Sequence, residues 1–253
     1  MLLENKVTII TGAAGGIGES LCNVFAREGA PVFMVDINEE NGKKIEARLK
    51  DQGYKAWFCK ADVSSADDTD NVFKKIAQFY DHIDVLINNA AMAYKATIAE
   101  LTEEQWDKQI GVNMKSVYLY SHRVIPIMAK IGGGCIINTG SVTSLVGVPD
   151  YAAYVGSKTG MLGLTRAMAL DHIGQGIRVN IICPSGVKTP LMDWQFSTAP
   201  DPQQEIDRVL SLHPIGRMAH PDEVAEFCVF LASEKGSYFT GTAFPFDGGY
   251  TAR

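Results

Sequence analysis

The chain alternates between short apolar runs and longer segments in which apolar residues recur with helical spacing. The runs are unbroken, which is typical of strands covered on both faces of a sheet. They lie at residues 7–10, 31–35, 56–58, 83–87, 135–137, 179–182 and 242–246. Helices are expected at residues 39–51, 67–80, 103–130, 151–173 and 222–233. This alternation predicts an α/β fold of Rossmann type, a doubly wound parallel sheet of about seven strands with helices on both faces.

The pattern continues to the end of the chain without a linker, repeat or low-complexity stretch. Single α/β domains of roughly 250 residues are common, so we expect one domain over residues 1–253. Residues 184–221 interrupt the alternation, because five prolines follow Pro184 there. Long irregular stretches in compact domains are often lids, and we predict a substrate-binding lid at 184–221. The alternative is a surface excursion that only packs. Pro245 in the last run predicts an edge strand.

Composition narrows the possible partners. The formal net charge is −6 and the pI about 5.4, without a lysine or arginine run, so we expect neither a nucleic-acid partner nor an acidic membrane. The first residues lack the features of a signal peptide, and no apolar run nears the ~20 residues of a membrane span. Five scattered cysteines without a CxxC pair indicate reduced thiols and a cytoplasmic location. The histidines show no metal-binding spacing, so no metal is expected.

A glycine-rich turn follows the first apolar run. The sequence from Thr11 to Gly18 reads TGAAGGIG and leads into an expected helix. Glycines let the backbone approach a pyrophosphate, and the helix N-terminus presents N–H groups and a positive dipole to it. Gly12, Gly16, Ile17 and Gly18 are therefore candidate cofactor-binding residues. The alternative is a tight strand–helix turn without a ligand.

The second apolar run leads into Asp36, 18 residues after Gly18. A carboxylate there can accept hydrogen bonds from the adenosine ribose and repels a 2′-phosphate. No basic residue stands at Gly15, Ile37 or Asn38 to bind such a phosphate. The sequence therefore favours NAD over NADP. The alternative is that Asp36 merely caps the helix expected to follow it.

Three residues of complementary chemistry lie beyond the fifth apolar run. Tyr154 and Lys158 are four residues apart and therefore share one face of the expected helix 151–173. A free tyrosine has a pKa of about 10, and a nearby cation lowers that pKa by stabilising the phenolate. Ser141 follows the strand expected at 135–137, at the edge where α/β sheets bind ligands. Its hydroxyl can donate to a carbonyl or alkoxide oxygen. Tyr154 is thus the candidate acid/base.

Together these motifs resemble the short-chain dehydrogenase/reductase family over essentially the whole chain. The motifs that carry the resemblance are Thr11-Gly12-x-x-x-Gly16-Ile17-Gly18, Asp62-Val63, Asn88-Asn89-Ala90, Asn113, Ser141, Tyr154-x-x-x-Lys158, Pro184 with Val187 and Thr189, and Asp247-Gly248-Gly249. Each is weak alone, but their order and spacing are specific. Two positions depart from the family pattern: Ala91 stands where glycine is common, and Ser185 replaces the glycine that usually follows Pro184.

The resemblance assigns further residues to the adenosine side of a bound NAD. Asp62 would hydrogen-bond to the adenine, with Val63 beside it. Asn88 and Ala90 would line the adenosine and steady the central sheet, and Asn89 also belongs to the implied cofactor site.

On the reaction side, the resemblance implies that Asn113 kinks the helix 103–130 and holds a water in a proton relay to Lys158. Pro184 would border the nicotinamide, and Val187 and Thr189 would hold its carboxamide.

The implied activity is hydride transfer between NAD and a secondary alcohol or its ketone. Candidate substrate contacts, besides Ser141 and Tyr154, are Met92, Leu145, Leu191 and Trp194. Exposed apolar clusters usually mark a binding surface, so we expect a compact apolar substrate, cyclic or aromatic. The alternative for Trp194 is packing at a subunit interface or in the lid.

Two other functions stay open at this point. One is a ketone reductase that acts on an acyl carrier protein, and the other is a non-catalytic NAD-binding regulatory protein. For every one of these functions the resemblance implies a homo-oligomer, a tetramer or a dimer.

Overall fold

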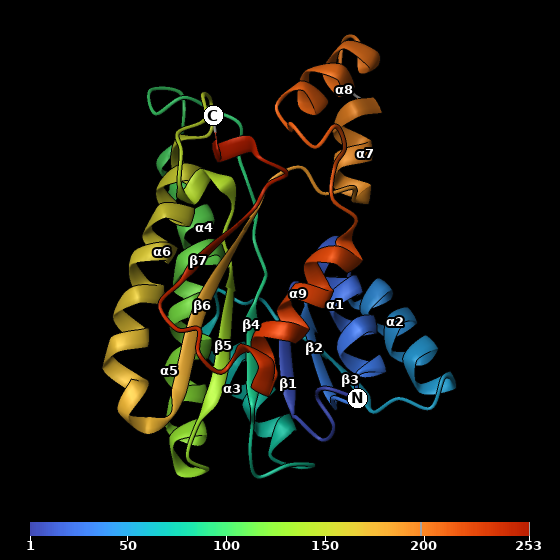
Figure 1. The fold of residues 1–253 in the computed structure, drawn as a ribbon, viewed down its shortest axis with the longest axis vertical. Helices are drawn as coiled ribbons and strands as arrows, with labels where there is room; N and C mark the ends of the chain where they lie inside the picture. Colours follow the sequence, from blue (N-terminus) through green and yellow to red (C-terminus); the bar gives the residue numbers. More distant parts are fainter. Residues whose placement is uncertain (198, 253) are drawn as a thin grey trace.

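The computed structural model describes residues 1–197 and 199–252, with only the backbone of Leu191, Trp194 and Gln195. In this part of the chain, seven parallel strands form one sheet in the order β3-β2-β1-β4-β5-β6-β7 (Figure 1). The strands are β1 (Thr8–Thr11), β2 (Val32–Asp36), β3 (Ala56–Lys60), β4 (Val85–Asn88), β5 (Gly134–Thr139), β6 (Ile177–Pro184) and β7 (Ala243–Phe246). Each overlaps a predicted run, and β7 is an edge strand as Pro245 predicts.

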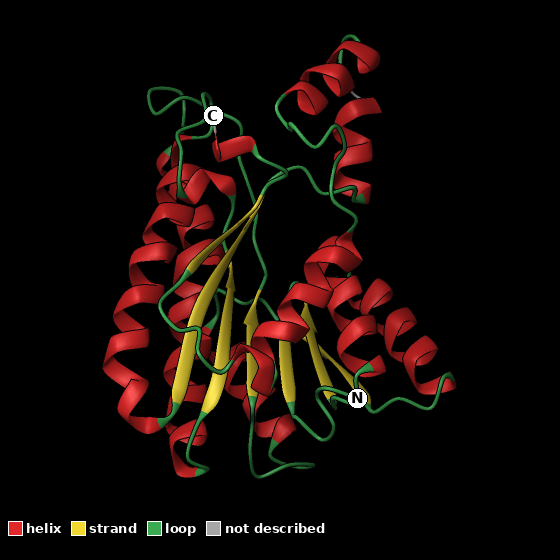
Figure 2. Ribbon diagram, viewed as in Figure 1, coloured by secondary structure: helices red, strands yellow, loops and turns green. Residues whose placement is uncertain are grey.

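Helices cover both faces of the sheet, which confirms the doubly wound arrangement (Figure 2). The helices are α1 (Gly16–Arg27), α2 (Glu39–Asp51), α3 (Ala66–Ile76), α4 (Glu103–Ile110), α5 (Ser116–Lys130), α6 (Ala152–His172), α7 (Pro190–Ser197), α8 (Pro202–Ser211) and α9 (Pro221–Ala232). Residues of α1, α2 and α9 form a buried apolar cluster with one face of the sheet, and residues of α3 and α5 form a second cluster with the other face.

The strands are apolar throughout because both of their faces are buried. Ile9 of β1 belongs to the cluster beneath α3 and α5, while its neighbour Ile10 belongs to the cluster beneath α1 and α9, and both are fully buried. Phe33 and Met34 of β2 divide in the same way. Successive side chains of a strand point to opposite faces, so a strand between two helical layers needs an unbroken apolar run.

The strand order reverses between β1 and β4. From β1 the chain builds outward through β2 to β3, and then returns to place β4 on the other side of β1. In an open α/β sheet, such a reversal leaves a crevice at the carboxyl ends of the two adjacent strands. The glycine-rich turn follows β1, and Asn89 follows β4. The topology therefore brings these two motifs to one crevice.

The segment 184–221 is more regular than predicted. It contains α7 and α8, which project beyond the carboxyl ends of the strands (Figure 1). Their first residues are Pro190 and Pro202, and proline is favoured at the first helical position because no backbone N–H is needed there. The prolines thus start helices, and the prediction of an irregular stretch is wrong. Phe196 of α7 is buried, so this apolar side chain packs inside the protein.

The helix predicted over residues 103–130 is interrupted. A π-helical turn, Gly111–Lys115, separates α4 from α5 and contains the buried side chain of Asn113. Such turns occur frequently at functional sites. The irregularity lies where the resemblance places the kink.

Candidate active site

The glycine-rich turn has a backbone that only small residues allow. Gly12 has φ 64°, and a Cβ added there would lie 2.7 Å from the Cα of Ala90. A Cβ at Gly18 would overlap the carbonyl oxygen of Gly12, which packs the first turn of α1 directly onto the loop. Gly15, in contrast, has no atom within 4 Å of an added Cβ. The turn is therefore tight against the protein and open on the side that faces the crevice.

Two adjoining cavities run along this crevice. The larger, of about 740 Å³, is lined by the glycine-rich turn from Gly12 to Glu19 together with Asp36, Asn89 and Thr189. The smaller, of about 360 Å³, is lined by residues including Asp62, Val63 and Lys108. Asp36 and Ala90 line both cavities. An elongated cavity with a helix N-terminus at one wall and a carboxylate midway fits a dinucleotide.

The Asp36 carboxylate is held in place by the backbone. One oxygen accepts a hydrogen bond from the N–H of Ala14 at 2.9 Å, and the other accepts from the N–H of Asn38 at 2.8 Å. A carboxylate has about four acceptor sites, so capacity remains for ligand hydroxyls. The alternative role as helix cap is wrong, because the cap of α2 is Asn38, whose side chain accepts from the N–H of Asn41.

The two asparagines after β4 have different roles. The Asn89 amide donates to the carbonyls of Thr11 and Gly12 at 3.0 and 3.1 Å, and so fastens the glycine-rich turn to β4. The Asn88 amide points to the face of the sheet that α5 covers, where it donates to the Asn138 side chain at 2.9 Å. Asn88 therefore steadies the sheet as expected, but it is absent from the walls of both cavities. The expectation that it lines the adenosine is wrong because its side chain faces the helices.

Asp62 and Val63 lie on the smaller cavity, where the resemblance places the adenine. One Asp62 oxygen accepts from both the backbone N–H and the hydroxyl of Ser64, at 2.9 and 2.7 Å. These bonds orient the carboxyl group. Met92 was predicted to contact the substrate. In the structure it lines this smaller cavity, where the resemblance places the adenine.

Tyr154, Ser141 and Lys158 meet at the carboxyl end of β5. Tyr154 and Lys158 project from α6, and Ser141 lies two residues after the end of β5. The Ser141 hydroxyl is close enough to the Tyr154 hydroxyl to lower the tyrosine's pKa against the effect of burial. The Lys158 ammonium lies 5.6 Å from the centre of the Tyr154 ring and donates to the Thr139 carbonyl at 2.6 Å. The predicted triad is therefore one constellation in space.

Burial dominates the electrostatics of this constellation. Desolvation raises the pKa of Tyr154, and the hydrogen bond from Ser141 opposes that rise. Desolvation also lowers the pKa of Lys158 to about 8. The Lys158 ammonium donates to the Thr139 carbonyl in this structure, and the lowering of the Tyr154 pKa by Lys158 stays a prediction. Thr139 was not predicted from the sequence, since a backbone acceptor leaves no side-chain signal.

Buried side-chain amides fasten the segment after β4. Asn113 accepts from the N–H of Met92 and donates to its carbonyl, each at 2.9 Å, and also donates to the Ser157 hydroxyl at 3.0 Å. Gln109, four residues earlier, accepts from the N–H of Tyr94 at 2.8 Å. The relay role of Asn113 stays a prediction. Gln109 was not predicted from the sequence; its spacing of one helical turn before Asn113 was a usable signal, whereas its full burial appears in the structure.

The segment beyond β6 reaches the larger cavity at Thr189 and Pro190. Val187 pairs with Ala219 in a short parallel bridge, in which the neighbouring Gly186 carbonyl and Lys188 N–H make the hydrogen bonds, both at 2.9 Å. Successive backbone groups of an extended chain point in opposite directions, so the Val187 N–H and carbonyl face away from Ala219. Thr189 touches the glycine-rich turn, because a Cβ on Gly16 would lie 3.4 Å from its methyl group. Pro184 ends β6 below them.

The remaining predicted substrate contacts divide in two. Leu145 is 37% exposed just after Ser141 and Ser144, and is available to a ligand. The side chains of Leu191 and Trp194 lie outside the described residues. Within residues 1–197 and 199–252, no group of three or more His, Cys, Asp or Glu could hold a metal ion. In the same part of the chain, no helix has the length and apolar character needed to cross a membrane.

Fold and site together define an α/β oxidoreductase with a dinucleotide crevice. The family model described as enoyl-(acyl carrier protein) reductase matches residues 12–251. A 3-oxoacyl-(acyl-carrier-protein) reductase of Thermotoga maritima is 38% identical, over 98% of this chain and 99% of its own. A cyclopentanol dehydrogenase of a Comamonas species is 37% identical, over 99% of this chain and 98% of its own.

Among solved structures, the 3-ketoacyl-(acyl-carrier-protein) reductase of Brucella melitensis complexed with NADH is similar with a TM-score of 0.90. It is 30% identical and the match covers 98% of this chain and 99% of that one. The chain belongs to the short-chain dehydrogenase/reductase family. It is an oxidoreductase that uses a nicotinamide cofactor.

Proposed function

We propose that this protein is an NAD-dependent dehydrogenase of secondary alcohols, which also reduces the corresponding ketones. The observation that carries the proposal is the meeting of Tyr154 and Ser141 at the carboxyl end of β5, beside the crevice that holds Asp36. A proton donor/acceptor and an oxygen-binding hydroxyl are what carbonyl–alcohol interconversion requires.

Each of these side chains has a distinct task. Tyr154 accepts the hydroxyl proton of the alcohol in oxidation and returns it in reduction. Ser141 donates a hydrogen bond to the substrate oxygen and holds it beside Tyr154. Lys158 binds the ribose hydroxyls, and Val187 and Thr189 hold the carboxamide. The bound nicotinamide supplies the site that accepts or gives up the hydride. Asn113, fixed in the π-helical turn, supports proton exchange with solvent.

The preference for NAD follows from Asp36. Its carboxylate, oriented by Ala14 and Asn38, accepts hydrogen bonds from the adenosine ribose and repels a 2′-phosphate. Asn38 and Asn41 are the polar neighbours on this wall, and neither carries a positive charge. Native enzyme should therefore reduce NAD much faster than NADP at equal concentration. Equal kcat/KM for the two cofactors would contradict this preference.

The substrate is proposed to be an apolar cyclic or aromatic secondary alcohol. Leu145, four residues after Ser141, is exposed, and relatives include the cyclopentanol dehydrogenase and a cyclohexanol dehydrogenase of an Acinetobacter species. The test is kcat/KM, followed by NADH absorbance, across cyclopentanol, cyclohexanol, aryl alcohols, polyols and sugar acids. Faster turnover of polyols or sugar acids would exclude the apolar substrate.

A second candidate is a reductase of 3-ketoacyl groups on an acyl carrier protein. The Thermotoga maritima relative has that name at 38% identity. An acetoacetyl thioester included in the same panel separates the candidates, because only a ketoacyl reductase should prefer it by an order of magnitude over cyclic ketones.

We further propose a homotetramer or dimer in the cytoplasm. Trp106, Tyr118 and Tyr238 expose 39%, 57% and 96% of their surface. Within the described part of the chain, the outer edge of β7 pairs with no other strand, and another copy could cover it. Light scattering after gel filtration gives the subunit number directly, and a monomer would contradict the proposal.

A further inference from the structure

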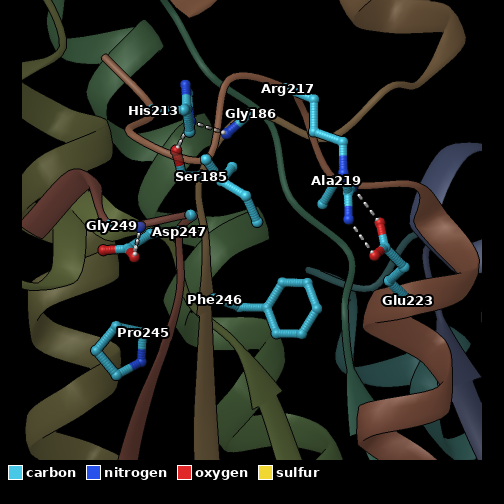
Figure 3. Close-up of a pocket in the computed structure, with 12 residues that line it drawn as sticks. Ser185, Gly186, His213, Arg217, Ala219, Glu223, Pro245, Phe246, Asp247 and Gly249 are labelled. Carbon is cyan, nitrogen blue, oxygen red and sulfur yellow. Dashed lines mark hydrogen bonds and ion pairs between the residues drawn. The ribbon is translucent and has the colours of Figure 1, made fainter.

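His213 lies where three segments meet at the base of segment 184–221, the predicted lid. It follows α8, packs 5.8 Å from the Tyr250 ring, and is only 5% exposed. Its Nδ1 lies 2.7 Å from the Val209 carbonyl in the last turn of α8. Its Nε2 accepts from the Gly186 N–H at 3.1 Å and is also hydrogen-bonded to the Ser185 hydroxyl. Figure 3 shows both of these groups directed at the ring.

These partners fix the state of the imidazole. A carbonyl oxygen can only accept, so Nδ1 must carry a hydrogen and donate to Val209. The Gly186 N–H can only donate, so Nε2 must present its lone pair. His213 is therefore the neutral Nδ1–H tautomer. A second proton on Nε2 would set two N–H groups against each other. The ring is thus bound at both nitrogens, to α8 on one side and to the segment after β6 on the other.

The hydrogen bonds of His213 to Val209 and Gly186 lie next to the backbone that is proposed to hold the cofactor. The chain leaves the sheet at Ser185 and Gly186, forms the lid helices, and returns from His213 to Ala219, where Val187 pairs with Ala219. Gly186 is directly before Val187, whose free backbone groups are proposed to hold the carboxamide. A Cβ on Gly186 would lie 3.0 Å from His213 Cε1, so the ring and this backbone are in close contact.

His213 lines a cavity of about 380 Å³ (Figure 3). The charged side chains on the wall of this cavity have other partners than the His213 ring. Arg217 on its wall is already paired with both carboxylate oxygens of Glu223 at 2.7 Å. Asp247 accepts from the N–H groups of Gly249 and Thr251 at 3.0 and 2.9 Å. The charged groups on this wall are therefore satisfied internally, and the contacts of His213 serve the lid base.

We propose that His213 is a positioning residue for the nicotinamide, an inference that rests on the proposed function. By accepting from Gly186 and donating to Val209, it sets the backbone at Val187 in register with the end of α8. Ser185, which replaces the usual glycine, adds a second donor to the same nitrogen. The lid helix and the carboxamide-binding backbone are thereby placed together.

Three substitutions separate the two bonds. His213→Gln retains an acceptor near the position of Nε2, His213→Asn retains a donor near Nδ1 but loses that acceptor, and His213→Phe loses both. His220 is the matched control, because it lies in the same segment but is exposed and only caps α9. Thermal melting of each variant checks that the fold is intact.

The readouts are binding of NADH, binding of ADP-ribose, and kcat. ADP-ribose lacks the nicotinamide, so it reports the adenosine side alone. His213→Asn and His213→Phe should weaken NADH about tenfold and lower kcat about 10²-fold, because a misplaced reactant costs this much. Their affinity for ADP-ribose should stay within about twofold of native. His213→Gln should recover most of the NADH affinity, and His220→Ala should bind both ligands like the native protein.

Other outcomes overturn the proposal in distinguishable ways. Native NADH affinity and kcat in His213→Phe would show that the bridge does not position the cofactor. Equal weakening of NADH and ADP-ribose would show that His213 only supports the fold. If the native protein itself fails to bind NADH, the proposed function fails, and the inference that rests on it fails too.

Discussion

The two sides of the active site are formed by different kinds of groups, backbone on one side and side chains on the other. On the side of β1, β2 and β4, the walls are mainly backbone: a glycine turn and N–H groups that orient Asp36. On the side of β5 and β6, the site consists of side chains that α6 and the loop after β5 bring together. Backbone walls depend on allowed φ and ψ angles, whereas side-chain constellations depend on packing and protonation. Mutations on the two sides should therefore fail in different ways.

The largest expected effect is on the side-chain half. Tyr154→Phe should lower kcat on the order of 10³-fold, because general acid–base catalysis contributes about 10²–10⁴-fold. NADH affinity and melting temperature should match those of the native protein, since the Tyr154 hydroxyl is needed only to transfer the substrate's proton. Stopped turnover with intact NADH binding is the expected result, and a variant that keeps a tenth of native kcat would exclude Tyr154 as the acid/base.

Ser141→Ala tests the same side-chain half through the pH dependence of the rate. The rate should fall about 10²-fold with the loss of one donor to the developing oxyanion. The Ser141 hydrogen bond lowers the Tyr154 pKa against the effect of burial, so its removal should raise that pKa. Oxidation needs the phenolate, and its rising limb should therefore move to higher pH. Complete profiles of kcat/KM against pH measure this, and an unshifted or downward-shifted limb would separate Ser141 from the tyrosine's ionisation.

These two predictions concern residues that the sequence places well, and the reason is local. Asp36 and the glycine-rich turn lie at the ends of apolar runs, where the parallel sheet gathers them at one edge, and Tyr154 and Lys158 lie one turn apart on a single helix. The doubly wound parallel sheet also follows from the alternation of runs, whereas the order of its strands comes from the structure. Such features are fixed within a few residues of chain.

The features that the sequence did not predict depend on distant partners. Pro190 and Pro202 looked like breakers, although each begins a helix. His213 finds its partners at Ser185 and Gly186, which no local pattern indicates. Asn88 and Asn89 are adjacent, and only the strand geometry decides that one faces the helices and the other the crevice.

On the backbone half, Asp36→Ala should narrow the difference between the cofactors. It removes the repulsion of a 2′-phosphate and the acceptor for the ribose hydroxyls, so the NAD/NADP ratio of kcat/KM should fall about tenfold, or about 1.4 kcal/mol. The pH profile should be unchanged because Tyr154 is untouched. Initial rates with both cofactors measure the ratio. An unchanged NAD/NADP ratio, or a shifted pH profile, would contradict the view that the two sides of the active site have independent roles.

The smallest expected effect compares two glycines of the same turn. At Gly12, φ is 64° and an added Cβ would lie 2.7 Å from the Ala90 backbone, so Gly12→Ala should cost about 1–3 kcal/mol. For a chain of this size each kcal/mol lowers the melting temperature by about 2–4 °C. Gly15→Ala is the matched control, because its Cβ would meet nothing within 4 Å. It should melt like the native protein and yet weaken NADH, since the new methyl group would point into the open crevice. Melting curves and NADH titrations of both variants test this. If Gly15→Ala melted as low as Gly12→Ala, the turn would be sensitive to any side chain, and strain at one backbone position would not explain why this wall needs glycine.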